Sequence, residues 1–444
     1  MAAPSGVRLS AAGQAAAAAR GEVSALALTE ACLQRIAERD EQVQAWAFLD
    51  PDHARAQAKG LDERRKRGLP LGPLHGVPVG IKDIIDTRDM PTEHGTVLHA
   101  GRRPRTDAWL VARLRAAGAV ILGKTVTTEL AVFSPNATRN PHDLARTPGG
   151  SSSGSAAAVA DGMVPLAVGT QTNGSVIRPA SFCGVYGFKP TFGRIPRTGV
   201  LRQSPPLDTI GVFAASIEDA ALLADVLFGN DPADPATLPE AMPALRRVAL
   251  AEPPVTPSLG FVRTPVWDQA EATTREAFAE LQDALGARIE MVPLPPLFDD
   301  VIELHRTIME ADLARSFADE VARGRDRLSD ILIGMIERGQ RVLAVDYNRA
   351  VDRRAALNAA LAPLFERYDA LLTPATLGEA PLGLASTGSP VFCTAWTLTG
   401  TPAVTLPLLQ GPAGLPLGAQ LVGRRGDDAR LLRTARWLET TLRS

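Results

Sequence analysis

The sequence predicts an α/β fold, because segments with strand character alternate with segments of helical character along the chain. The apolar runs 77–85, 119–122 and 403–406 lack the polar–apolar alternation of a half-exposed strand, which indicates strands covered on both faces. Hydrophobic residues make up 45% of the 444 positions, enough to bury a large core. We therefore expect a sheet enclosed between helices.

The remaining elements follow from the same patterns. Ser10 and Thr29 are suitable N-caps for the first two helices, and the charge run 61–68 is typical of a solvated helix end. Helices are expected at 8–20, 26–48, 155–162, 267–286, 300–323, 327–339, 341–366 and 427–442, and further strands at 248–250, 370–372 and 418–422. The chain has no internal repeat, and the Pro-rich segments 251–260 and 293–297 are expected to be loops.

Charge and cysteine usage argue against several functions. A net charge of −2 predicts no basic face for nucleic acid. The three cysteines, Cys32, Cys183 and Cys393, lack CxxC spacing, which argues against a zinc site or a disulfide framework. No window approaches the roughly 20 uninterrupted apolar residues that a membrane span needs. These features predict a cytoplasmic protein that binds neither nucleic acid nor membrane, with Cys183 a small buried hydrophobe.

Two serine-bearing turns and one lysine carry the chemical signal. The turn Gly149–Ser155 reads GGSSSGS, and Asn173-Gly174-Ser175 follows an apolar segment. Lys82 lies upstream in the apolar run VGIKD. A lysine in such a run either extends to water or is held near neutrality. A neutral amine beside a serine hydroxyl is a general base beside a nucleophile.

These residues resemble the amidase signature family, whose members hydrolyse amides with a Ser–cis-Ser–Lys triad. The resemblance is strongest over 149–191 and continues through 76–83 and 123–143, with weaker similarity elsewhere. It implies one compact domain over 1–444 with a mixed sheet of about eleven strands and helices on both faces. Within it we expect N-terminal helices at about 8–70, the signature core at about 71–240 and a variable helical cover at about 300–366.

The resemblance implies a role for each motif residue. Ser175 matches the nucleophile, and Ser151, which precedes it by 24 residues, matches the bridging serine. The bond between Gly150 and Ser151 is then a non-proline cis peptide, and Lys82 is the neutral base. Backbone N–H groups of Thr172, Asn173, Gly174 and Ser175 form the oxyanion hole. Ser152 supports the lysine, and no cofactor or metal is required.

Three positions depart from the family pattern. The usual DxGGS turn reads Gln171-Thr172-Asn173-Gly174-Ser175, and the arginine that normally stands two places after the nucleophile is Arg178, three places after it. Asn adopts positive φ more readily than most residues, so we expect the turn to survive. If the Asp and the Arg of the usual motif pair with each other, both partners of that pair have changed here. What supports the turn in this chain is then an open question.

Several other patterns are better explained by structural roles than by catalysis. Residues 118–125 match the P-loop letters, but the variable positions are a buried strand rather than a loop. Gly150–Gly154 matches the G-x-S-x-G letters around Ser152, yet no strand leads into it. Asp83 is expected to hold loops, because adjacent residues of a strand point to opposite faces. The histidines are expected to be structural or solvent-facing: His53, His75, His94, His99, His142 and His305.

The sequence thus predicts a free-standing amidase that acts through an acyl-enzyme on a small amide or carbamate, as a monomer or homodimer. Substrate contacts are expected from Thr125, Phe133 and Trp396, beside the helices of 300–366. We favour hydrophobic or aryl amides, anilides or aryl carbamates, with esterase or urethanase side activity. Alternatives are the glutamine-hydrolysing A-type subunit of a tRNA-dependent amidotransferase, and a non-catalytic binding protein on the same scaffold.

Overall fold

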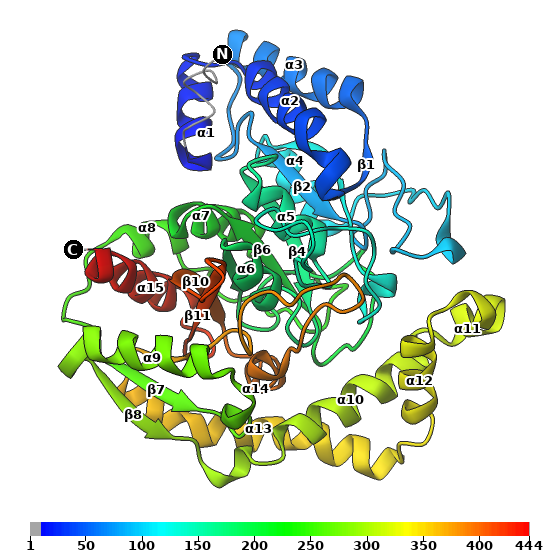
Figure 1. The fold of residues 1–444 in the computed structure, drawn as a ribbon. Coiled ribbons are helices and arrows are strands. Elements are labelled where there is room, and N and C mark those ends of the chain that lie inside the picture. The colour runs from blue at the N-terminus through cyan, green and yellow to red at the C-terminus, as the bar shows by residue number, and fades with distance from the viewer. Residues whose placement is uncertain (1–9, 444) are drawn as a thin grey trace.

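The centre of the molecule is an 11-stranded mixed sheet with strand order β1-β3-β2-β4-β6-β5-β10-β11-β9-β7-β8. The computed structural model describes residues 10–443, so the first two residues of the predicted helix 8–20 lie outside the described part. In Figure 1 the N-terminal helices lie at one end of the molecule and the helices of residues 301–367 lie at the other.

The sheet combines parallel and antiparallel pairs. Strands β3, β2 and β4 are parallel neighbours, as are β9, β7 and β8, and the strands between these groups pair antiparallel. The strands are β1 (Trp46–Leu49), β2 (Pro78–Lys82), β3 (Val120–Thr125), β4 (Leu166–Gln171), β5 (Tyr186–Lys189), β6 (Thr209–Ala214), β7 (Leu259–Arg263), β8 (Ile289–Pro293), β9 (Ala370–Pro374), β10 (Ala403–Gln410) and β11 (Pro416–Val422).

Helices connect and cover these strands on both faces (Figure 1). Their bounds are α1 (Ala11–Arg20), α2 (Ala25–Val43), α3 (Pro51–Lys66), α4 (Trp109–Ala116), α5 (Ser153–Ala160), α6 (Ile177–Cys183), α7 (Ile217–Leu227), α8 (Leu245–Leu250), α9 (Ala272–Leu285), α10 (Val301–Ser316), α11 (Ala318–Gly324), α12 (Asp330–Gly339), α13 (Ala344–Arg367), α14 (Val391–Thr399) and α15 (Asp428–Arg443). None of those described is long and apolar enough to cross a membrane.

Alternation along the strands divides the core into layers. On β7, Leu259 and Phe261 pack into the cluster that holds α4, α7, α9 and α15, while Val262 packs into the cluster of α10, α12, α13 and α14. A third cluster joins α2, α3, α5 and α6 to the other face of β3 and β4. Because successive strand residues point to opposite faces, one apolar run such as LGFV supplies both layers.

The predicted fold class, a single compact α/β domain with an eleven-stranded mixed sheet, is confirmed. Most predicted helices are present, with 300–323 divided into α10 and α11. The predicted strand 248–250 is wrong, because these residues end helix α8. The predicted helix 26–48 is too long, since it ends at Val43 and residues 46–49 form edge strand β1.

Candidate active site

Lys82 is the last residue of β2 and is completely buried. β3 and β4, its parallel neighbours, end at the same edge of the sheet with Thr125 and Gln171. The Lys82 Nζ donates to Ser151 Oγ at 2.7 Å and to Thr170 Oγ1 at 2.9 Å. Burial among apolar neighbours holds the pKa of Lys82 well below its usual value. Burial therefore favours the uncharged form of the amine.

Ser151 lies in the loop that precedes α5, and its peptide bond with Gly150 is cis. The carbonyl oxygen of Gly150 accepts a hydrogen bond from Arg178 Nη2 at 2.6 Å, and Arg178 Nη1 donates to Gly388 O at 2.6 Å. Arg178 is fully buried. The displaced arginine of the motif thus fixes the cis-peptide loop rather than pairing with a carboxylate.

Ser175 lies between β4 and α6, in a turn that Gln171 supports. The Gln171 Oε1 accepts from the backbone N–H groups of Val176 and Ile177, at 2.8 and 3.0 Å. The Gln171 Nε2 donates to Thr397 Oγ1 at 2.9 Å. An amide therefore replaces the usual carboxylate as acceptor at the start of α6. The support of the turn that the sequence left open comes from Gln171 and α14.

Asn173 holds the turn through its side chain, not through an unusual backbone. Its Oδ1 accepts from Thr394 Oγ1 at 2.8 Å, and its carbonyl accepts from Thr397 Oγ1 at 2.5 Å. The turn is present as expected, but neither Asn173 nor Gly174 adopts a left-handed φ, so tolerance of positive φ is not the reason. Gly174 is required for close approach instead, since a Cβ there would lie 2.9 Å from Pro390 Cβ.

The turn presents backbone donors and an unengaged hydroxyl. Within residues 10–443, the N–H groups of Asn173, Gly174 and Ser175 donate to no protein acceptor, and no residue bonds Ser175 Oγ. Ser175 is 8% exposed. A cluster of free N–H groups beside a free hydroxyl is the arrangement that stabilises an oxyanion formed on attack by that hydroxyl.

Comparison with known proteins agrees with this geometry. The family model described as Amidase matches residues 27–432. The chain belongs to the amidase signature family. It is 37% identical to the A-type subunit of the glutamyl-tRNA(Gln) amidotransferase of Chloroflexus aggregans, over 94% of this chain and 92% of the relative.

Two solved structures show the same amidase fold. Peptide amidase from Stenotrophomonas maltophilia superposes with a TM-score of 0.85 at 32% identity, over 98% of this chain and 97% of the other. A structure described as a vestigial complex that reveals the origins of an s-triazine catabolic enzyme gives a TM-score of 0.91 at 30% identity, over 98% of each chain.

Thr170 is a site residue of this amidase that its sequence pattern did not reveal. Its hydroxyl accepts from Lys82, and Ser152 Oγ bonds both the N–H and the carbonyl of Thr170, each at 3.2 Å. Gly169 permits this approach, because a Cβ there would lie 2.6 Å from Ser152 Oγ. Ser152 therefore lies where a supporting residue was predicted. Only pairing of β2 with β4 brings Thr170 to Lys82, and no local motif indicates it.

A cavity of about 420 Å³ adjoins the turn of the amidase. Asn173 and Phe133 line it together with residues of α10, α12 and α14. Of the three residues predicted to contact substrate, Phe133 lines this cavity. Thr125 and Trp396 do not line the cavity: both are fully buried, Thr125 bonding Ser155 and Trp396 packing in the core.

The remaining patterns have structural roles in the amidase. Lys124 is fully buried in strand β3, donates to Ile85 O at 2.9 Å and pairs with Asp83 at 3.3 Å, so it cannot reach a phosphate. Cys183 is buried in α6. His305 donates to the carbonyl of Thr172 at 2.8 Å. In the described part, no group of three or more His, Cys, Asp or Glu could hold a metal ion.

Proposed function

We propose that this amidase cleaves a carboxamide C–N bond through an acyl-enzyme on Ser175, with Lys82 as the base and Ser151 as the bridge. The observation that carries the proposal is the 2.7 Å hydrogen bond between the fully buried Lys82 amine and Ser151 Oγ. A neutral lysine beside a hydroxyl can accept its proton, which a protonated lysine cannot.

In the proposed mechanism, Lys82 takes the Ser151 proton while Ser151 takes the proton of Ser175. The Ser175 Oγ attacks the amide carbon, and backbone N–H groups of the 172–175 turn stabilise the oxyanion. The proton returns through Ser151 to the leaving nitrogen, and the C–N bond breaks. Water, activated by the same relay, then hydrolyses the ester.

For the substrate, the relatives favour glutamine, the amide hydrolysed in a tRNA-dependent amidotransferase, over the aryl amides suggested by the sequence. The support is 37% identity to the A-type subunit of such an enzyme over nearly the whole chain. The cavity adds to it, because Arg306, Glu310 and Asp330 are among its lining residues. Charged groups on the wall suit a substrate that carries charge away from its scissile amide. In this role the chain works with partner subunits.

A free-standing hydrolase of apolar amides or carbamates is the second candidate. Its support is the other side of the same wall, where Ile302, Met309 and Ile331 line the cavity beside Phe133. Peptide amidase has the same fold, and its name describes an enzyme that acts on a different amide.

Ammonia or amine release by the purified chain distinguishes the two candidates. The panel contains glutamine, an aliphatic amide, an anilide and an aryl carbamate, with Ser175→Ala as control. Turnover of glutamine, by the chain alone or with partner proteins added, supports the amidotransferase role. Turnover of anilide or carbamate by the chain alone supports the free-standing hydrolase. Equal rates for the wild type and Ser175→Ala would refute the proposed nucleophile.

A further inference from the structure

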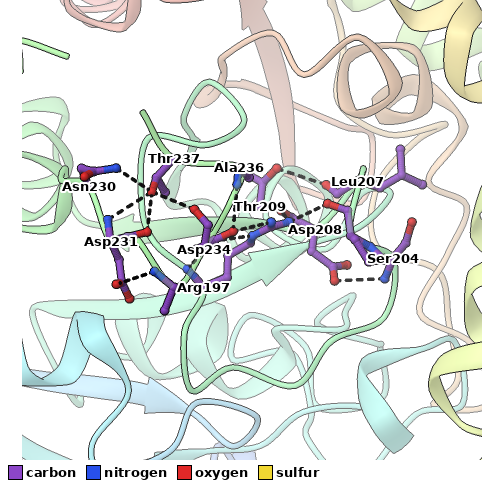
Figure 2. A network of polar contacts seen from close by, with 12 residues as sticks. Arg197, Ser204, Leu207, Asp208, Thr209, Asn230, Asp231, Asp234, Ala236 and Thr237 are labelled. Carbon is purple, nitrogen blue, oxygen red and sulfur yellow. Dashed lines mark hydrogen bonds and ion pairs between the residues drawn. The ribbon is translucent and has the colours of Figure 1, made fainter. Parts of the chain in front are cut away.

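Asp208 lies behind the active-site turn, in the loop that leads into β6. Its Oδ1 is 2.7 Å from Thr172 Oγ1, and its Oδ2 accepts from the N–H groups of Gln203 and Ser204 at 2.9 and 3.0 Å. Figure 2 shows Asp208 between Ser204 and the Arg197–Asp234 pair. A second cavity of about 270 Å³ is lined by Asp208, Thr170 and Thr172. Asp208 therefore faces the residues that bond the base and form the turn.

The hydroxyl of Thr172 has more acceptors around it than protons to give. Gln203 Oε1 lies 2.6 Å from Thr172 Oγ1, on top of the 2.7 Å contact to Asp208. The orientation of the Gln203 amide is fixed, because its Nε2 donates to Leu130 O at 2.8 Å. Thr172 Oγ1 therefore makes two short contacts, one to Gln203 Oε1 and one to Asp208 Oδ1. Its single hydroxyl proton can serve only one of them. The other contact requires a proton on Asp208.

We propose that Asp208 is held as a neutral carboxylic acid that donates to Thr172, while Thr172 donates to Gln203, and that this makes Asp208 a positioning residue for the turn that carries Ser175. The proposal rests on the proposed function for its consequence in catalysis. The chain of donors runs from Asp208 through Thr172 to Gln203 and on to Leu130 O. The turn is thereby held through Thr172, in addition to the bonds that it makes with Gln171 and α14.

Electrostatics acts in the same direction. Burial raises the pKa of the Asp208 carboxyl to about 6, although the N–H groups of Gln203 and Ser204 and the charge of Arg197 act against it. In the proposed arrangement the Thr172 hydroxyl accepts from the acid, which stabilises the neutral form. No carboxylate in the described part lies within ion-pair distance of Lys82. An ionised Asp208 would raise the pKa of Lys82, so a neutral Asp208 keeps that amine unprotonated.

The other charged groups around Asp208 are engaged elsewhere. Arg197 donates to the Asp208 carbonyl but pairs its guanidinium with Asp234. On α10, Asp312 accepts from Ser204 Oγ. His305 on the same helix is neutral, because burial lowers its pKa to about 4. The titratable and charged groups around Asp208 that can affect its pH dependence are Lys82, Arg197, Asp234, His305 and Asp312.

Asp208→Asn and Asp208→Ala test the catalytic consequence. The asparagine amide can donate to Thr172 and accept from Gln203 and Ser204, so kcat/KM at pH 6 is expected within about threefold of wild type. The alanine removes both interactions and is expected to lose about 100-fold, the effect of a small displacement at a catalytic turn. Wild-type activity falls as Asp208 ionises at higher pH, and Asp208→Asn lacks that fall. An Asn variant that folds but is as inactive as the Ala variant would overturn the proposal.

Infrared difference spectra test the proton itself, independently of activity. The wild type at pH 6 is expected to show the carbonyl band of a protonated carboxyl that shifts in D2O and disappears in Asp208→Asn. Asp234→Asn is the matched control in the same network, because Arg197 lowers the pKa of Asp234 despite its burial, and it is expected to keep the band. Absence of the band in wild type, or its loss in Asp234→Asn alone, contradicts the proposal. A present band with no amide turnover would instead refute the proposed function.

Discussion

The core around the active site and the helical cover of residues 301–367 are built in opposite ways. The core buries basic side chains completely, among them Lys82, Lys124 and Arg178, and bonds each to specific oxygen atoms. The cover buries some polar groups, such as His305 and Asp312, but most of its buried side chains are apolar at helical spacing, and other apolar side chains are exposed, such as Ile331 and Leu343. A buried polar group without its partner costs far more than an exchanged apolar one. Side chains of the cover can therefore be exchanged at lower cost than those around the proposed triad.

Among the variants that test this comparison, Ser175→Ala in the core is expected to have the largest effect on activity. Removal of the hydroxyl leaves no nucleophile for an acyl-enzyme, so kcat should fall by at least about 10³-fold. The side chain bonds nothing in the described structure, so the free energy of unfolding should hardly change. Amide turnover and thermal unfolding measure the two quantities. A large loss of stability would mean that Ser175 has a structural role.

Lys82→Met tests the base with a side chain of similar length. Loss of general-base catalysis is expected to lower kcat by about 10²- to 10⁴-fold. The pH-dependent rise of kcat/KM that reflects deprotonation of Lys82 should disappear with it. A variant with an unchanged pH profile would contradict Lys82 as the titrating base.

The same variant should change how stability depends on pH. The pKa of Lys82 is lower in the folded than in the unfolded protein, so between these two values the unfolded chain binds more protons. Stability contributed by this group is present above the unfolded pKa and is lost as pH falls towards the folded one. Relative to Lys82→Met, wild type should lose up to about 1.4 kcal/mol per pH unit below pH 10. Denaturant unfolding at several pH values measures it, and parallel curves would refute the shift.

A matched pair of neighbouring residues on α12 is expected to have the smallest effects on activity and tests the cover. Leu332 is completely buried, whereas Ile331 is 47% exposed and lines the cavity. Leu332→Ala should cost about 2–5 kcal/mol of unfolding free energy. Ile331→Ala should cost about 0.5 kcal/mol or less and change KM for the accepted amide by about three- to tenfold. A destabilised Ile331→Ala with unchanged KM would mean that α12 is core rather than substrate wall.

Local patterns predicted those features whose signal is local. The family resemblance predicted Lys82, Ser151 and Ser175 as the reacting residues, which the variants above test, and the cis bond that it implied at Ser151 is present. The strand expected at 248–250 failed because three apolar residues fit one helical turn as well as a strand. Strands β4 to β8 were not assigned, since short apolar runs gain their identity from the neighbours they pair with.

The sequence alone determined the α/β class, the family and the residues of the two serine turns, because these depend on residue types at fixed spacing. Only the tertiary structure decided what holds those residues in place. Arg178 reaches Gly150, Gln171 reaches Thr397, and Asp208 reaches Thr172 across long distances in sequence. Such contacts depend on strand order and on which loops meet at one edge of the sheet, and no local sequence pattern encodes that meeting.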